Sequence, residues 1–120
     1  MDRVLIIEDD VQVADMLTRA LEPVGYDVKT ALDGAAGLKF NQQNPVDLII
    51  TDILLPGAGG IEIIAELKRD YPEIKIIAIS GGGRVSAEEH LKVASQMGAN
   101  LTLAKPFTYT DLMDAVRTLL

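Results

Sequence analysis

Cysteine is missing from this chain of 120 residues, and histidine occurs only once. A chain without cysteine has no disulfides, no thiolate metal sites and no cysteine nucleophile. A single histidine also argues against a zinc site, because zinc sites in proteins are built mainly from cysteine and histidine. Any metal bound by this chain is therefore expected to use oxygen ligands.

Long hydrophobic runs are missing too. No apolar segment approaches the ~20 residues that a membrane-spanning helix needs. The first residues, MDRVLIIEDD, carry acid where a secretory signal peptide has its basic flank. These patterns predict a cytoplasmic protein without a membrane segment, and the length predicts one compact domain over residues 1–120.

Basic residues are in the minority, with 11 Lys and Arg against 18 Asp and Glu, which gives a formal net charge of −7. A phosphate backbone selects for basic protein surfaces, so this balance argues against direct binding to nucleic acid or to anionic membranes. Much of the acidity serves solubility in the ordinary way. The acids that stand next to one another in the sequence need a separate explanation.

Five apolar stretches alternate with segments of helical spacing, which predicts an α/β fold of five βα units. Residues 48–50 and 76–79 are apolar throughout, as expected of parallel strands covered by helices on both faces. The stretch YDVKTA alternates more and is expected at a sheet edge. The five predicted strands are RVLII (3–7), YDVKTA (26–31), DLIIT (47–51), IKIIAIS (74–80) and NLTLA (100–104).

The predicted helices lie between these strands, and each has a recognisable beginning, end or apolar face. The first helix is expected to bury Val11, Ala14, Leu17, Leu21 and Val24 and to close at Gly25, and the second to run over 34–43. The third is expected to carry Ile61, Ile64, Ala65 and Leu67 and to stop at Pro72. The fourth is expected to open with a capping box at Ser86–Glu89 and to present Leu91, Ala94 and Met97, and the fifth to begin near Thr108 and to repeat Leu112, Val116 and Leu119.

Polar residues follow four of the predicted strands. The run Glu8-Asp9-Asp10 follows the first strand and Asp52 the third, while Ser80 and Lys105 follow the fourth and fifth. In an open parallel sheet these carboxyl ends converge on one site. Helix capping accounts for Asp10. It does not account for Asp52, which follows an apolar strand and precedes a Pro-Gly loop.

Carboxylates that are brought together repel one another and raise each other's pKa unless a cation intervenes. Mg²⁺ suits such a place, because it binds a few carboxylate oxygens, keeps several waters and bridges to phosphate. Taken alone, Lys105 would be an ordinary surface residue and Ser80 an ordinary turn residue. Together with the acids they supply a nucleophile, a cation and a hydroxyl, which is what a phosphoryl group needs.

Four motifs carry a resemblance to a known family. The segments IIEDD, ITDILLPGAGG, IAISGG and GANLTLAKPF occur in the order and spacing of the CheY-like receiver domains of bacterial response regulators. The resemblance covers essentially the whole chain. It implies a flavodoxin-like, doubly wound (βα)5 fold whose parallel five-stranded sheet has the order 2-1-3-4-5.

The resemblance also implies a role for each site residue. Asp52 would be the phospho-acceptor, and Ser80 and Lys105 would hold the phosphoryl oxygens. Mg²⁺ would be bound by Glu8, Asp9, Asp52 and the backbone carbonyl of Leu54. The Lys105–Pro106 peptide is expected to be cis, and Gly81 would leave room beside the phosphate.

In function, the resemblance implies a phospho-acceptor rather than an enzyme, although one with its own phosphorylation and dephosphorylation chemistry. The phosphoryl donor would be a sensor histidine kinase or a histidine phosphotransfer protein. The face made by the fourth helix, fifth strand and fifth helix would switch and bind an unidentified output protein or a second phosphorylated copy. Because DAVRTLL completes the fifth helix without a linker, we expect a stand-alone receiver.

Two positions depart from the family pattern. Gly59-Gly60 replaces the usual Asp-Gly before the third helix, which predicts a looser loop there. Thr102 stands where many receivers carry a rotating Tyr or Phe, so the three glycines at 81–83 are expected to carry the switch instead. His90, on the fourth helix, is expected to face solvent and not to relay phosphate.

Other functions fit the sequence less well. A haloacid-dehalogenase-type phosphatase needs a second aspartate two residues after the first, where this chain has Leu54. GAGGIE and GGGRVS both fail the dinucleotide-binding pattern, and no G-K-[ST] occurs. A flavodoxin-like FMN protein would carry hydroxyls and amides after the first strand. A phosphorylation-independent interaction module of the same fold remains the alternative.

Overall fold

The computed structural model of the chain describes residues 2–53, 59–80 and 86–120, without the side chains of 86–91. Its five strands form one parallel sheet of order β2-β1-β3-β4-β5, which confirms the predicted fold. The elements are β1 (Arg3–Ile7), α1 (Val11–Leu21), η1 (Glu22–Val24), β2 (Asp27–Ala31), α2 (Gly34–Gln43), β3 (Leu48–Asp52), α3 (Gly60–Asp70), β4 (Lys75–Ser80), α4 (Ser86–Met97), β5 (Leu101–Ala104) and α5 (Tyr109–Leu119).

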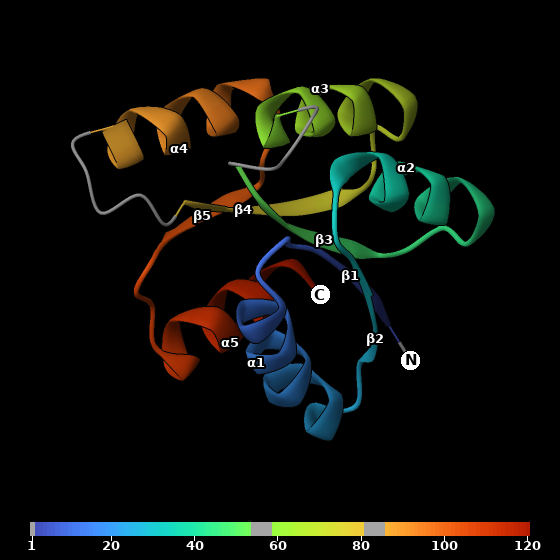
Figure 1. Cartoon of the computed structure of the whole chain (residues 1–120), viewed down its shortest axis with the longest axis vertical. Helices are drawn as coiled ribbons and strands as arrows, with labels where there is room; N and C mark the ends of the chain where they lie inside the picture. The colour runs from blue at the N-terminus through green and yellow to red at the C-terminus, as the bar shows by residue number, and fades with distance from the viewer. Residues whose placement is uncertain (1, 54–58, 81–85) are drawn as a thin grey trace.

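Helices cover both faces of the sheet. Figure 1 shows α2, α3 and α4 on one face and α1 and α5 on the other. Successive residues of a strand point to opposite faces, and β1 divides its residues in this way. Leu5 and Ile7 pack in the cluster under α2 and α3, whereas Val4 and Ile6 pack in the cluster under α1 and α5. The three inner strands are therefore apolar in both directions, while β2 lies at an edge as predicted.

The first helical segment differs from its prediction at both ends. Ala14, Leu17 and Leu21 are buried as expected, but Val11 is 66% and Val24 is 42% exposed. The α-helix ends at Leu21, and the last turn is the 3₁₀ helix η1. Pro23 explains the change, because it has no N–H to continue the α-helical ladder. The chain then leaves through Gly25 at a φ of 110°.

The later helices largely follow their predictions. Side chains cap α1, α2 and α5, and Thr108 and Asp111 form a reciprocal capping box at α5. In α3 the prediction missed Ile63, which is buried. In α4 Ala94 is buried, but Met97 is 43% exposed. The predicted capping box at Ser86 and the predicted positions of the Leu91 and His90 side chains lie outside the described residues.

The start of α3 is packed closely against the end of β3. The N–H of Gly60 donates to the carbonyl of Ile53 at 2.8 Å, and Gly60 is buried. A Cβ on Gly60 would collide with the Asp52 carbonyl and lie 2.6 Å from the Ile53 Cα. The predicted looser loop lies mostly outside the described residues, but Gly60 itself, the first residue of α3, is closely packed. A Cβ on Gly59 would have no atom of the described residues within 4 Å, so the two neighbouring glycines differ in the space around them.

Alanine substitutions at these neighbouring glycines should have opposite outcomes. Gly60→Ala should lower the free energy of unfolding by about 3 kcal/mol, because backbone atoms must move to admit the methyl group. Gly59→Ala is the matched control and should change it by less than about 1 kcal/mol, since nothing lies near the new atom. Urea unfolding followed by circular dichroism measures both. Equal losses for the two variants would contradict the packing described here.

Candidate functional site

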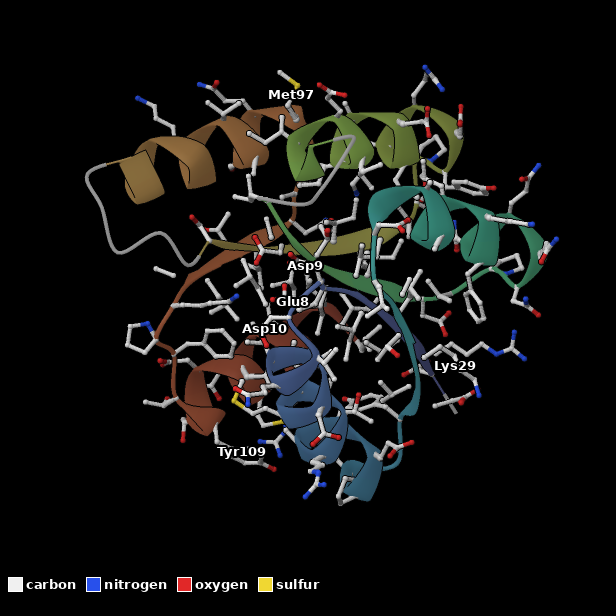
Figure 2. The ribbon with its side chains drawn as sticks, in the orientation of Figure 1. Glu8, Asp9, Asp10, Lys29, Met97 and Tyr109 are labelled. Atoms are coloured by element: carbon white, nitrogen blue, oxygen red, sulfur yellow. The ribbon has the colours of Figure 1, made fainter. Side chains whose placement is uncertain are left out.

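Three carboxylates meet at the carboxyl edge of the sheet. Glu8 and Asp9 follow β1, and Asp52 ends β3. One oxygen from each lies within 4.8 Å of the others. Figure 2 shows Glu8 and Asp9 where the chain passes from β1 to α1. Glu8 and Asp52 are buried, whereas Asp9 is exposed. The sequence prediction that these three acids share a place is confirmed.

Asp10 has a different role from its two neighbours. Its side chain accepts hydrogen bonds from the backbone N–H groups of Gln12 at 2.9 Å and Val13 at 3.3 Å. It is therefore the N-cap of α1, which satisfies two N–H groups that have no partner in the helix. The run of three acids thus divides into two members of the cluster and one cap, as the sequence predicted.

Lys105, which directly follows the edge strand β5, reaches the acidic cluster with its side chain. Its Nζ lies 3.1 Å from Asp52 Oδ2 and 3.2 Å from Glu8 Oε1. The Lys105 backbone N–H donates to the Ser80 carbonyl at 2.8 Å, which positions the backbone that carries this side chain. The Lys105–Pro106 peptide is cis, as expected. One ammonium group therefore faces two carboxylates.

This arrangement leaves the negative charge only partly compensated. Burial, together with the hydrogen bond and charge of Asp52, raises the pKa of Glu8 from its ordinary 4.5 to about 7, although Lys105 opposes the shift. Partial burial works against the charge of Lys105, but Asp52 and Glu8 outweigh it and raise the pKa of that ammonium group. At neutral pH, the cluster can still accept a further cation.

Ser80 supplies the fifth polar side chain of the site. It ends β4 and is fully buried, and its Oγ has no hydrogen-bond partner among the described residues. A buried hydroxyl without a partner is costly, so such groups in folded proteins commonly have a role that uses them. Its place beside the cluster makes it available to a ligand oxygen at this edge of the sheet.

The donor set fits Mg²⁺. Three carboxylates are hard oxygen ligands, and the exposed Asp9 leaves one side of the cluster open to water and to phosphate. The predicted fourth ligand, the Leu54 carbonyl, lies outside the described residues, as does Gly81. What the sequence did not reveal is the contact of Lys105 with Glu8 as well as with Asp52. The close approach of Gly60 to the Asp52 backbone was not evident from the sequence either, because glycine occurs both in crowded places and in loose loops.

Thr102 lies in the middle of β5 opposite Ala78 of β4 and is partly buried. Its side chain has no ring to turn between a buried and an exposed position. The sequence expectation that this position lacks an aromatic gate therefore holds for the folded chain as well.

The geometry of the site can be compared with known proteins. The sequence model of the response regulator receiver domain matches residues 4–117. The chain is 32% identical over 120 residues to the response regulator receiver protein CpdR of Brucella abortus. This match covers 100% of this chain and 98% of CpdR. It is 34% identical over 122 residues to the DNA-binding dual master transcriptional regulator RpaA of Synechocystis sp.. This match covers 100% of this chain and 49% of RpaA. The chain thus spans about half the length of several transcriptional regulators that it matches.

Solved structures give the same likeness in three dimensions. The response regulator protein TrrA of Thermotoga maritima, in complex with Mg(2+)-BeF, superposes with a TM-score of 0.88 at 29% identity, over 100% of both chains. A response regulator receiver domain protein from Clostridium thermocellum superposes with a TM-score of 0.90 at 29% identity, over 99% of this chain and 94% of that one.

Within the described residues, no helix is long and apolar enough to cross a membrane.

The raised pKa of Glu8 predicts how stability depends on pH when no divalent metal is present. Between pH 4.5 and about 7 the folded chain holds a proton on Glu8 that the unfolded chain releases. The contribution of Glu8 to the free energy of unfolding is therefore greatest below pH 4.5 and is lost as the pH rises through 7. The loss should be on the order of 2 kcal/mol. Denaturant unfolding in chelator from pH 5 to 8 measures it.

Glu8→Gln is the control for this prediction, because an amide has the size of the carboxyl and does not titrate. The difference between wild type and Glu8→Gln should change with pH in the direction stated, whatever the other groups contribute. Parallel pH profiles for the two proteins would show that Glu8 has an ordinary pKa in the folded chain.

Proposed function

Since the chain belongs to the response regulator receiver domain family, we propose that it acts in two-component signalling by accepting a phosphoryl group on Asp52. The observation that carries this assignment is the position of Lys105 Nζ between Asp52 and Glu8, with the unpartnered hydroxyl of Ser80 at the same edge of the sheet. The phosphoryl donor is a phosphohistidine of a sensor histidine kinase or of a histidine phosphotransfer protein.

In the proposed reaction a carboxylate oxygen of Asp52 attacks phosphorus while the bond from phosphorus to the donor histidine nitrogen breaks. The product is an acyl phosphate on Asp52 and a free imidazole on the donor, which recovers the electron pair of the broken bond. Lys105 moves from the Asp52 carboxylate to a phosphoryl oxygen, and Ser80 Oγ donates to another. These two residues offset charge on the group being transferred.

Glu8, Asp9, Asp52 and the Leu54 carbonyl are the residues proposed to hold Mg²⁺. When bound, the metal neutralises charge on the carboxylates and on the incoming phosphoryl oxygens. The related TrrA structure, a complex with Mg(2+)-BeF, supports this choice of metal. The same residues would serve hydrolysis, in which water attacks phosphorus, the bond from phosphorus to the Asp52 oxygen breaks and inorganic phosphate leaves. The chain would then remove its own phosphate without being an enzyme for a separate substrate.

The rest of the proposal concerns the setting of this site. The described residues fold as one receiver unit that we place over residues 1–120 and in the cytoplasm. Its output partner is unidentified and binds the face formed by α4, β5 and α5, where phosphorylated copies would also pair. The alternative is an interaction module that binds its partner without phosphate. The intact set of Glu8, Asp9, Asp52, Ser80 and Lys105 favours the phospho-acceptor.

Phosphate uptake tests the assignment directly. Incubation with acetyl phosphate and Mg²⁺ should add one phosphate to wild type, and peptide mass spectrometry should locate it on Asp52. Asp52→Asn should take up none, and chelator should abolish uptake by wild type. Asp10→Asn is the matched control and should retain uptake, because asparagine caps a helix as well as aspartate does. Uptake by Asp52→Asn, or equal uptake in chelator, would contradict the assignment.

The switch can be followed by amide hydrogen exchange. On phosphorylation Ser80 should be drawn toward the phosphoryl group, so exchange should change most over residues 80–97. Phosphate favours one of two arrangements, and the population shifts accordingly. Thr102→Ala should leave the response nearly intact, because Thr102 is too small to act as a gate. Ser80→Ala should reduce the response at least severalfold. A response lost in Thr102→Ala, or centred on α1 and α2, would rule out this switch.

A further inference from the structure

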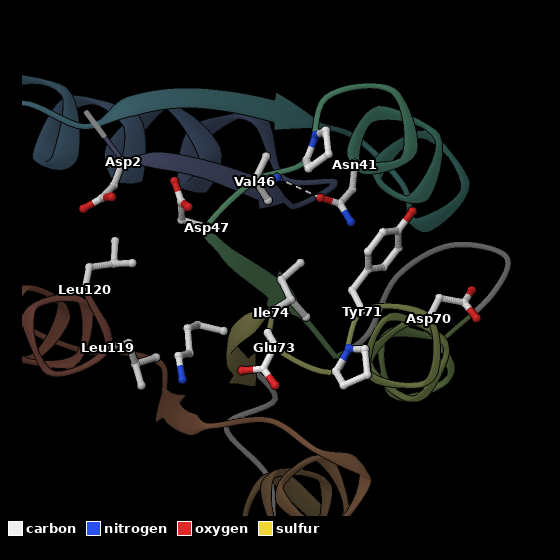
Figure 3. A pocket seen from close by; sticks show the side chains of 13 residues that line it. Asp2, Asn41, Val46, Asp47, Asp70, Tyr71, Glu73, Ile74, Leu119 and Leu120 are labelled. Atoms are coloured by element: carbon white, nitrogen blue, oxygen red, sulfur yellow. Dashed lines mark hydrogen bonds between the residues drawn. The ribbon is translucent and has the colours of Figure 1, made fainter.

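A hollow of about 640 Å³ lies at the amino ends of the strands, the end of the sheet opposite the acidic cluster. It is bounded by the segments that precede β1, β3 and β4 and by the last turns of α2, α3 and α5. Figure 3 shows its side chains from close by. The floor is apolar, with Val46, Ile74 and Leu119. None of the residues named for phosphoryl transfer lines this hollow.

The rim of the hollow is strongly acidic. Asp2, Asp47, Asp70 and Glu73 line it and are exposed, and Lys75 is the one basic residue in the lining. Asp70 already pairs with Arg69, whose Nε lies 3.0 Å from Asp70 Oδ1, so the attraction for a ligand cation comes chiefly from Asp2, Asp47 and Glu73. Parallel α/β topology also directs the carboxyl ends of α2, α3 and α5 to this end of the sheet, and these ends carry partial negative charge. The rim therefore attracts a cation.

The arrangement of the acids does not suit a metal ion. Among the described residues, Glu8, Asp9 and Asp52 form the group whose ligand oxygens lie close enough together to hold one, and no three of the rim acids do. The rim acids are instead spread around an apolar floor. This pattern fits an extended organic cation with an apolar body better than a compact inorganic ion.

A buried amide adds an independent indication of a ligand. Asn41 is 1% exposed, and its Oδ1 accepts from the Val46 N–H at 3.0 Å, the dashed line in Figure 3. Its Nδ2 is buried in the wall of the hollow and has no acceptor among the described residues. The partly exposed Tyr71 side chain lies on the same wall. Because Nδ2 is itself buried, a ligand carbonyl would reach it only if a neighbouring side chain of the wall turned aside.

We propose that this hollow docks a peptide segment of a partner protein in which Arg or Lys stands next to an aliphatic residue. The cation contacts the rim acids, the aliphatic side chain covers Val46 and Ile74, and a backbone carbonyl accepts from Asn41 Nδ2. Asp47 is already fixed for this role, because its Oδ2 accepts from the Arg3 N–H at 2.8 Å and its own N–H donates to the Arg3 carbonyl at 3.0 Å. The inference is independent of the proposed phosphoryl chemistry.

The test is a ¹⁵N NMR titration of the whole chain with the end-capped tripeptide Leu-Arg-Leu. A dissociation constant on the order of 1 mM is expected for so short a probe. Shifts should be confined to residues around the hollow and should include the side-chain amide of Asn41, which a general charge attraction would not move. The end-capped tripeptide Leu-Glu-Leu should cause no such shifts.

A second test removes negative charge from the rim of the hollow. The double variant Asp2→Asn with Glu73→Gln should bind the Leu-Arg-Leu probe about fivefold more weakly. The matched control is Glu62→Gln with Asp114→Asn, which removes the same charge from exposed positions outside the hollow. Equal binding of the two tripeptides, equal weakening by the two double variants, shifts centred on Glu8 and Asp9, or no shift at about 10 mM probe would each overturn the proposal.

Discussion

The ammonium group of Lys105 lies within hydrogen-bond distance of two buried carboxylates, and the carboxyl edge of the sheet is organised around it. Burial and the neighbouring Asp52 raise the pKa of Glu8, and the nearby charge of Lys105 opposes that shift. A single lysine compensates only part of the negative charge of the cluster. The folded chain thus tolerates this cluster, and the cluster can still bind a second cation and a phosphoryl group.

The positions of these groups follow from the topology. Parallel strands present their carboxyl ends at one edge, so residues that are 97 positions apart, such as Glu8 and Lys105, come into contact. This is why the fold class and the meeting of Glu8, Asp9, Asp52 and Lys105 could be predicted, whereas the strand order was predicted from the resemblance to receiver domains. The apolar stretches fixed the strands, and the polar residues directly after them had to converge. The capping role of Asp10 could be predicted for the same reason, since it begins the next helix.

Other features could not be read from the sequence, because they depend on packing between distant segments. The pattern of the first helical segment placed Val11 and Val24 on its apolar face, but both are exposed, and Val24 lies in the 3₁₀ turn η1 instead of in α1. Glycine at 60 could mean freedom or crowding, and only the approach of α3 to the end of β3 decides between them. The buried amide of Asn41 is likewise invisible in a sequence, where asparagine near a helix end suggests an ordinary cap.

The division of the core into two clusters has a consequence for how this chain can evolve. The cluster under α2 and α3 and the cluster under α1 and α5 share no residue, and the sheet backbone separates them. Substitutions on the two sides, for example at Ile64 and at Leu17, are therefore too well separated to compensate for one another, and their effects on stability should add. One face of the molecule can drift toward a new partner while the other keeps its packing unchanged. The shared element that neither face can alter alone is the set of inner strands that carries Glu8 and Asp52.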